Sequence, residues 1–590
     1  MEKYNIYKKV VLPLCVATVG ILSSCSAFDD FLTVYPTNQI TGEQFWEDKS
    51  DLESVVFSCY KQMTAKAMSK RMFLWGEGRS DNFIPRQADD QDIVDLMNAN
   101  LLPSNDWFNW ASFYTEIGYC NLVLSKGEDV VAKDNSFSES DWLPIQAEVK
   151  TLRAIAYFYL VRTFRDVPFR ITSTDTSVGV RDPQAQTSSE EILSFLINDL
   201  ESVKDNGMTN YGNDVDNHGR ITKNAIYTVL ADLYLWRASK NSSQDSIKVY
   251  GDQYKTDYQK CIECCNYVIE AMNYKFNEKG QDHIGKTNTE YLELPLFLPE
   301  TRGQMTDIPY NEVFGNKNSL ESIFEVEFSS SGGYNWAVND FLGSYNSGNY
   351  DAGLLAPSTV MTEFSTDVNT MGFFKTDIRA AQSLKLASGG STTLSNEFTK
   401  YITTSITINE PTDLTKRNAA SYSGHRSKNY VDANYILYRA SDVILMKAEA
   451  MAALLTNKTE NADEYKEAFD LVNAVFYRSN PSIAARDNLN LENFESKSDL
   501  VDLIYQERQR EFYCEGKRWF DLVRYAYKSG STTSMLNLLT AKFSSNASAV
   551  KAKMATMNSL FSPVFKDEMK VNTALVQNPA WPDNETSERN

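Results

Sequence analysis

The sequence predicts a mainly α-helical protein in which stacked helical hairpins of the tetratricopeptide kind are interrupted by an irregular, loop-rich insertion with a few short strands. Two observations carry this prediction. Most long stretches place apolar residues at three- and four-residue steps, which is the spacing of one face of an α-helix. Residues 276–430 are instead rich in Gly, Ser, Thr and Asn and hold only short apolar runs. No strict 34-residue period is present, so the hairpins rest on periodicity and not on a repeat.

The helical pattern before the insertion runs through residues 41–124, 147–164, 188–203, 219–239 and 258–272. Asp166-Val167-Pro168 ends the second of these segments, because the residue before a proline disfavours helix. Ser188 precedes an acidic first turn and is a typical helix cap. Small residues such as Ala231 allow the close helix contacts that stacked hairpins need.

Within the insertion, residues 322–329 and 399–408 are short apolar runs that predict strands. Helices are expected again over residues 434–455, 465–479 and 499–526, and the tail over residues 561–581 is expected to be extended. The chain is therefore divided into a signal (1–24), an N-terminal helical part (25–275), a loop-rich part (276–430) and a C-terminal helical part (431–590) that closes the scaffold.

The first residues have the order of a secretory signal. Three lysines precede an apolar run from Val10 to Leu22, which is too short to span a bilayer. The run ends in Leu22-Ser23-Ser24-Cys25, which resembles the bacterial lipobox, so Cys25 is the expected lipidation site. An ordinary signal with an incidental cysteine is the alternative. No later stretch is apolar enough to span a membrane, and we expect a body tethered by lipid.

The composition excludes several classes of protein. With 58 basic and 78 acidic residues, the chain carries a net charge of −20, which disfavours a general binder of nucleic acid or of anionic membranes. Only three histidines are present, at His218, His283 and His425, and none belongs to a GxSxG, HExxH or phosphate-loop motif. We therefore expect no enzyme, no catalytic residue, no cofactor and no metal.

Six cysteines remain after Cys15 and Cys25 are set aside. Cys261, Cys264 and Cys265 share one face of an expected helix, and core packing is the favoured interpretation. A disulfide, as exported proteins often have, and a metal site are the alternatives. A structural zinc ion needs four ligands, however, and no histidine or fourth cysteine lies nearby in the sequence.

A charged constellation lies near the C-terminus. Glu507, Glu511 and Glu515 step by four and would line one helical face, like paired acids for general acid/base catalysis. Arginines at 508, 510, 518 and 524 lie within reach at three- and four-residue spacing. Carboxylates held by arginine keep a lowered pKa and are poor general acids, so the constellation predicts a structural network.

The segment from Glu327 to Tyr350 holds six aromatic residues in 24, mixed with Ser, Gly and Asn. This mixture is typical of binding loops, because flat rings offer apolar platforms and small polar residues adapt to hydroxyl groups. The expected platforms are Tyr334 and Trp336, and the expected neighbours are Asn335, Asn339, Asp340 and Tyr345. Burial of these aromatics beneath the loop is the alternative.

Several stretches together resemble the SusD/RagB family of surface lipoproteins in Bacteroidota-type nutrient uptake. They follow in the family's order over about residues 25–582: Cys25, FLTVYPTNQITGEQFW, WASFYTEIGYCN, AEVKTLRAIAYFYLVRTFRDVP, GRITKNAIYTVLADLYLW, YILYRASDVILMKAEAMA, QERQREFYCEGKRWFDLVR and QNPAW. One departure is Arg165, where the family usually has glycine before Asp-Val-Pro. That departure puts only a local turn in doubt.

The resemblance implies a tetratricopeptide-like scaffold in which the loop-rich residues 276–430 are the variable ligand-binding part. It also implies attachment to the outer membrane facing outward, and a SusC-type TonB-dependent barrel as partner. It also implies that residues 75–86 approach the ligand, which adds Trp75, Arg79, Asp81, Asn82 and Arg86 as candidate contacts. Trp110 fits the helical pattern and is expected in the core, whereas Trp107 is extra and is a further candidate.

The favoured function is capture of an oligosaccharide, starch-like or another glycan, and its delivery to that transporter. Binding of peptides in the manner of RagB is an alternative, and a secreted glycoside hydrolase and a pure scaffold are more remote ones. Loss of the signal makes the net charge −22, which disfavours strongly anionic glycans unless a local basic patch acts within a Debye length of about 8–10 Å.

Overall fold

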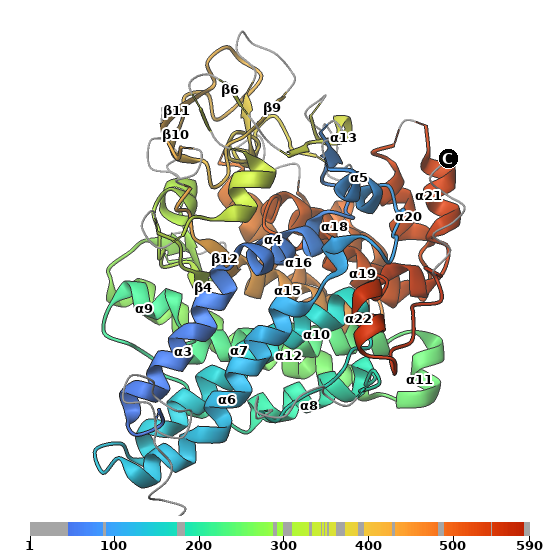
Figure 1. Cartoon of the computed structure of the whole chain (residues 1–590). Helices are drawn as coiled ribbons and strands as arrows, with labels where there is room; N and C mark the ends of the chain where they lie inside the picture. The colour runs from blue at the N-terminus through green and yellow to red at the C-terminus, as the bar shows by residue number, and fades with distance from the viewer. Residues whose placement is uncertain are drawn as a thin grey trace, which may run out of the picture.

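The structure is a computed structural model that describes residues 45–86, 90–173, 183–286, 292–298, 309–329, 333–343, 345–346, 349–350, 353–361, 372–386, 394–427, 431–481, 489–543 and 545–582. Helices make up most of this part of the chain, and the strands are short (Figure 1). No helix within these residues is long and apolar enough to cross a membrane.

Within the described residues from 45 to 278, the regular elements are helices apart from the two-residue strand β1 (Ile84–Pro85). Its helices are α3 (Lys49–Thr64), α4 (Lys66–Glu77), α5 (Gln91–Met97), η1 (Asp106–Phe108), α6 (Ala111–Lys133), α7 (Glu139–Phe164), α8 (Ser189–Glu201), η2 (Lys204–Asn206), α9 (Asp214–Gly219), α10 (Lys223–Asn241), α11 (Gln244–Tyr250) and α12 (Gln253–Glu278).

Helices return after the irregular middle of the chain. They are α15 (Ala440–Leu454), α16 (Ala462–Ser479), η5 (Leu491–Asn493), α18 (Lys497–Glu511), α19 (Arg518–Ser529), α20 (Thr533–Thr540), α21 (Ala547–Lys553), η6 (Met557–Leu560) and α22 (Lys566–Val571).

Local sequence explains where several helices begin. Asp48 forms a capping box with α3 and Ser496 forms one with α18, so the first free N–H groups of both helices are satisfied. Ser188 caps α8 as the sequence predicts, and its side chain accepts a hydrogen bond from the Glu191 N–H.

The long helices stack on one another as hairpins. The helix α6 packs against α3 and α7, α10 packs against α12, and α15 packs against α12, α16 and α18. Short connections join α6 to α7 and α15 to α16, so each of these pairs folds back on itself. The predicted mainly α-helical hairpin scaffold is therefore confirmed.

The core-facing residues of α12 follow the predicted face. Cys261, Cys264 and Cys265 are buried and carry free thiols, on a helix that packs against α10 and α15. Ala231 of α10 and Trp110 are buried as well. Core packing is thus the role of these three cysteines in the structure.

Strands occur mainly between residues 283 and 425 and form two-stranded antiparallel sheets in the described part of the chain. The elements of this region are β2 (His283–Ile284), β3 (Leu294–Phe297), η3 (Asn311–Gly315), β4 (Ser322–Val326), η4 (Val338–Leu342), β5 (Tyr345–Asn346), β6 (Asn349–Tyr350), β7 (Leu354–Leu355), α13 (Ser358–Met361), α14 (Arg379–Ser383), β8 (Leu384–Leu386), β9 (Leu394–Phe398), β10 (Thr403–Ile408) and β11 (Ala420–His425). β6, β9, β10 and β11 gather at the top of Figure 1, away from α6, α7 and α8. β4 and β10 confirm the two predicted strands, whereas the division of the chain into four parts stays a prediction.

Three expectations were wrong in detail. Residues 435–439 form a strand, β12 (Tyr435–Arg439), because they pair with β4 before α15 begins. The segment 499–526 breaks between α18 and α19, where Cys514 and Gly516 have positive φ angles of 71° and 75°. The tail contains the short helix α22, whose acidic first turn and basic last turn match the helix dipole.

Candidate functional site

A surface group of aromatic and charged side chains forms where α4, η1 and η4 meet. We name it the Trp336 cluster, and its members are Lys66, Lys70, Trp107, Tyr334, Trp336 and Asp340. The two lysines lie one turn apart on α4, so they project from the same face of that helix. Trp107 comes from η1, and Tyr334, Trp336 and Asp340 come from the start of η4 and the residues before it.

The rings of the Trp336 cluster lie close to one another and to its cations. The ring centroids of Tyr334 and Trp336 are 4.1 Å apart, with an angle of 44° between the planes. The Lys66 Nζ lies 4.4 Å from the Trp336 centroid, and the Lys70 Nζ lies 5.0 Å from the Trp107 centroid. These are cation–π distances, which hold each lysine against the face of a tryptophan. All three rings are partly exposed.

Asp340 links the two lysines. Its Oδ2 lies 2.9 Å from the Lys70 Nζ and 4.0 Å from the Lys66 Nζ. The Lys66 side chain is 55% exposed and the Asp340 side chain 26% exposed, so both keep hydrogen-bonding capacity at the surface. Arg71 lies 5.5 Å from the Trp107 ring and pairs with Asp106. The local charge is therefore slightly positive, in contrast to the net charge of the whole chain.

The structure brings four of the predicted residues together here, namely Trp107, Tyr334, Trp336 and Asp340. Asn335 and Asn339 are next to them in sequence but are buried. The Asn335 side chain donates to the Ala433 carbonyl and accepts from the Val338 N–H, and the Asn339 side chain donates to Asp340 Oδ1. The side chains of Asn335 and Asn339 thus form hydrogen bonds within the protein and do not belong to the exposed surface of the loop.

Four further candidates are corrected by their burial. Trp75, Arg79, Asp81 and Asn82 are each at most 5% exposed. The Trp75 ring stacks on Phe113 and its Nε1 donates to the Trp107 carbonyl, 2.8 Å away. A ligand at the surface therefore does not reach these side chains in this structure, and Trp75 acts by fixing the backbone that carries Trp107.

The polar members of this group have partners inside the protein. The Arg79 guanidinium donates to the Ser559 and Leu560 carbonyls, and Asp81 forms a two-bonded ion pair with Arg518. The Asn82 side chain bridges Glu77 and Gln509. A structural role accounts for these residues, because buried polar groups need such partners.

The remaining candidates lie elsewhere or are not described. Arg86 is exposed, and its backbone N–H donates to the Gly353 carbonyl beside the β1–β7 pair. Tyr345 begins β5, and its side chain lies outside the described part of the chain, as Cys25 does. All three stay predictions. Lys66 and Lys70 were not predicted, because their only signal is a four-residue spacing that many helices share.

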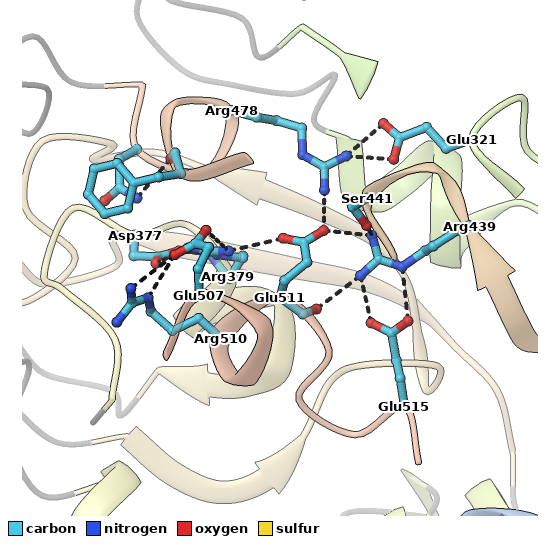
Figure 2. Close-up of polar contacts among 12 residues, drawn as sticks. Glu321, Asp377, Arg379, Arg439, Ser441, Arg478, Glu507, Arg510, Glu511 and Glu515 are labelled. Atoms are coloured by element: carbon cyan, nitrogen blue, oxygen red, sulfur yellow. Dashed lines mark hydrogen bonds and ion pairs between the residues drawn. The ribbon is translucent and has the colours of Figure 1, made fainter. Parts of the chain in front are cut away.

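The charged constellation near the C-terminus is a buried network (Figure 2). Glu511 accepts hydrogen bonds from Arg379, Arg439 and Arg478, and Figure 2 shows the three guanidinium groups converging on it. Glu515 pairs with Arg439 and with Lys400. The sequence predicted that the interleaved arginines of the same segment would be the partners of these acids, but most partners come from distant segments. The local prediction is confirmed for Glu507, which pairs with Arg510 at 3.0 Å.

The electrostatics of this network oppose acid catalysis. Burial raises the pKa of Glu511, but the three guanidinium groups outweigh burial and hold that pKa well below its usual value. Burial likewise opposes ionisation of Glu515, and Arg439 and Lys400 still lower its pKa. Both side chains are ionised and fully engaged, as predicted for a structural network. Glu515 lies beyond the end of α18, so the three acids do not share one helical face.

Two internal cavities border this network. Each has a volume of about 20 Å³, which is room for about one water molecule and not for a sugar ring. The first is lined by Arg379, Lys400, Arg439, Arg478 and Glu511 among others, and neither is lined by a residue of the Trp336 cluster.

Comparison with known families matches both halves of the chain. Residues 320–581 match the SusD family, and residues 30–235 match a family described as starch-binding and associating with the outer membrane. The two matches together span most of the sequence. The chain belongs to the SusD family.

Relatives within the SusD family are distant in sequence. A SusD-like protein of Formosa agariphila is 24% identical over 519 residues, covering 87% of this chain and 90% of the relative. The starch-binding protein SusD of Bacteroides thetaiotaomicron is 23% identical over 243 residues, covering 40% of this chain and 38% of that protein.

Solved structures share the fold. B. fragilis NanU superposes with a TM-score of 0.60 at 17% identity, covering 93% of this chain and 100% of that one. A SusD superfamily protein from Bacteroides thetaiotaomicron gives a TM-score of 0.59 at 17% identity, covering 91% and 99%. The helical scaffold described above is therefore the scaffold of SusD superfamily proteins.

Proposed function

We propose that this SusD family member is a cell-surface lipoprotein, anchored in the outer membrane through Cys25, that binds a glycan at the Trp336 cluster. It passes the glycan to a SusC-like TonB-dependent outer-membrane transporter. The observation that carries the proposal is the partly exposed pair of rings at Tyr334 and Trp336, flanked by the exposed Lys66 head group and the partly exposed Asp340 carboxylate.

The chemistry of the Trp336 cluster suits a sugar. A pyranose ring has apolar C–H faces that pack on an indole or phenol ring, and hydroxyl groups at its edge. Lysine offers donors and aspartate offers acceptors at that edge, so a few charged groups can fix the orientation of a ligand held mainly by aromatic contact. Trp107, whose ring lies against the Lys70 Nζ at 5.0 Å, offers a further ring to a second sugar unit.

A binding role is also supported by the state of the buried acids. Glu507, Glu511 and Glu515 are engaged by basic side chains and have no access to a ligand at the surface. The lipobox at Cys25 and the family's described association with the outer membrane support the location, and the family resemblance supports the transporter as partner.

Calorimetry with a panel of soluble neutral and uronic-acid glycans tests the site. We expect one member of the panel to bind, and Trp336→Ala to weaken that binding about 30-fold, since a central aromatic contact is worth about 2 kcal/mol. Tyr274→Ala is the matched control, because Tyr274 is a 69% exposed aromatic on α12. Equal affinity of Trp336→Ala and the parent, or no heat from any glycan with the folded protein, would contradict the proposal.

Membrane attachment and partnership are tested separately. A Cys25→Ala variant is expected to leave the outer-membrane fraction, and the parent is expected to co-purify with a TonB-dependent barrel from detergent extracts. Retention of the variant in the membrane would refute anchoring through Cys25, and purification of the parent without any barrel would refute the partnership. Neither result bears on glycan binding, which the calorimetry tests.

A further inference from the structure

Two thiols and a carboxyl group meet in the seam between α3 and α6. Cys59 comes from α3, and Glu116 and Cys120 lie one turn apart on α6, so both face the same side of that helix. The Cys120 Sγ lies 3.9 Å from the Cys59 Sγ and 3.8 Å from Glu116 Oε1. The ligand atoms of all three residues lie within 4.8 Å of one another, and each residue is at most 1% exposed.

Glu116 is out of place as an ordinary core residue. Its Oε2 is buried without any hydrogen-bond partner in the described part of the chain, and no described lysine or arginine pairs with it. Burial and the nearby Cys59 raise the pKa of Glu116 well above its usual value. Other buried acids here are compensated: Glu449 pairs with Arg524 and Lys528. A buried carboxyl in this position either stays protonated or takes a cation as its partner.

We propose that Cys59, Glu116 and Cys120 bind a zinc ion. Zn–S bonds of about 2.3 Å in a tetrahedral site place two sulfur atoms about 3.8 Å apart, close to the observed separation of the two Sγ atoms. The carboxylate supplies Oε1 as the third donor, and the unpartnered Oε2 supplies the fourth if the carboxylate binds through both oxygens. Zinc accepts both thiolate and carboxylate donors.

The charges around the site also balance. Two thiolates and one carboxylate around Zn²⁺ leave a single negative charge. Burial raises the pKa of Cys120 well above its usual value, and the nearby Arg153 charge opposes that rise. Arg153 and Lys150 both pair with Asp199, so this group of three carries a single positive charge. Binding releases the two thiol protons and the carboxyl proton to water.

Zinc at this position would tie α3 to α6. The helix α4 begins directly after α3 and carries Lys66 and Lys70. The metal site on α3 is therefore only a few residues along the chain from these two lysines. Metal binding would thus contribute to the stability of the first helical hairpin and keep the start of α4 in place. Glycan contacts are not made by the metal itself.

Metal content of the full chain tests the proposal. Protein purified without chelators from cells grown with added zinc is expected to carry about one zinc per chain, measured by inductively coupled plasma mass spectrometry. Growth with cobalt in place of zinc should give the thiolate-to-cobalt charge-transfer absorption. Cys59→Ser, Cys120→Ser and Glu116→Gln should each lose most of the metal, whereas Cys264→Ser, which removes a buried thiol from α12, should keep it.

The parent protein alone can overturn the proposal, whether or not the variants fold. If the parent carries neither zinc nor cobalt and its thiols titrate as free, the seam holds no metal. If its intact mass is two hydrogens lighter and peptide mapping joins Cys59 to Cys120, the pair is a disulfide and the proposal fails. A cobalt charge-transfer band that persists in Cys59→Ser would place the metal elsewhere and would also refute it.

Discussion

Replacing Glu511 by glutamine removes one negative charge from the centre of the buried network and leaves its shape almost unchanged. The carboxylate of Glu511 lies between Arg379, Arg439 and Arg478, and its side chain is 2% exposed. The network holds five groups of each sign: Glu321, Asp377, Glu507, Glu511 and Glu515 against Arg379, Lys400, Arg439, Arg478 and Arg510. The substitution therefore leaves one buried positive charge without a counter-charge.

The expected loss follows from that imbalance. Removing one partner from a buried, hydrogen-bonded ion pair costs about 3–5 kcal/mol, because the remaining charge stays buried. A glutamine oxygen can still accept a hydrogen bond, but its amide N–H groups face guanidinium donors, so the substitution does not restore the lost interactions. We expect Glu511→Gln to lower the free energy of unfolding by about 4 kcal/mol.

Urea unfolding at pH 7, followed by far-ultraviolet circular dichroism and by tryptophan fluorescence, measures the change. Glu263→Gln is the matched control, because Glu263 pairs with Lys260 at the surface and its side chain is 62% exposed. We expect this control to change stability by less than about 0.5 kcal/mol. A loss below about 1 kcal/mol for Glu511→Gln would refute the reasoning, since the network would then tolerate an unbalanced charge.

Three further predictions concern acid stability and backbone strain. Burial opposes ionisation of Asp442, yet Lys517 and Arg508 lower its pKa to about 2. Because this pKa and that of Glu511 lie below the values of the unfolded chain, the stabilisation from both acids is complete above about pH 5 and is lost as the pH falls. An acid titration should therefore show the free energy of unfolding falling below about pH 5, and falling less steeply in Glu511→Gln. Arg165 has a φ of 68°, so Arg165→Gly should be about 1 kcal/mol more stable than Arg165→Ala in urea, and equal stability would show no strain. Gly76→Ala would place a Cβ 1.8 Å from a backbone oxygen and should cost about 3 kcal/mol, whereas Gly118→Ala meets no atom within 4 Å and should gain about 0.5–1 kcal/mol of helix stability; similar thermal melting of the two variants would contradict this contrast.

The positions of helices and of their ends could be predicted from the sequence, because local residues control them. Apolar periodicity gives the helices, because a helix buries one stripe of its surface whatever its partner is. Ser188 and the Asp166-Val167-Pro168 stop show that a cap or a proline acts within a few residues. The unusual Arg165 was also visible as a departure from glycine, and its positive φ explains why glycine is usual there.

Side-chain exposure was not predictable in the same way. Trp75 and Trp336 are both tryptophans beside polar residues, yet Trp75 is 3% exposed and Trp336 is partly exposed. The difference arises from what covers each ring: Phe113 and Phe164 enclose Trp75, and they come from α6 and α7. Sequence near a residue cannot report the segments that fold over it.

The sequence by itself determined the helical hairpins, the acid–arginine character of residues 507–524 and the aromatic segment at residues 327–350, because each depends on residue types and short spacings. Tertiary structure alone decided which groups meet. Lys70 reaches Asp340 across 270 residues, and Glu511 takes its arginines from three other segments. Cys59 and Cys120 become neighbours only because α3 packs on α6. Long-range contacts of this kind depend on how helices pack, which no local pattern records.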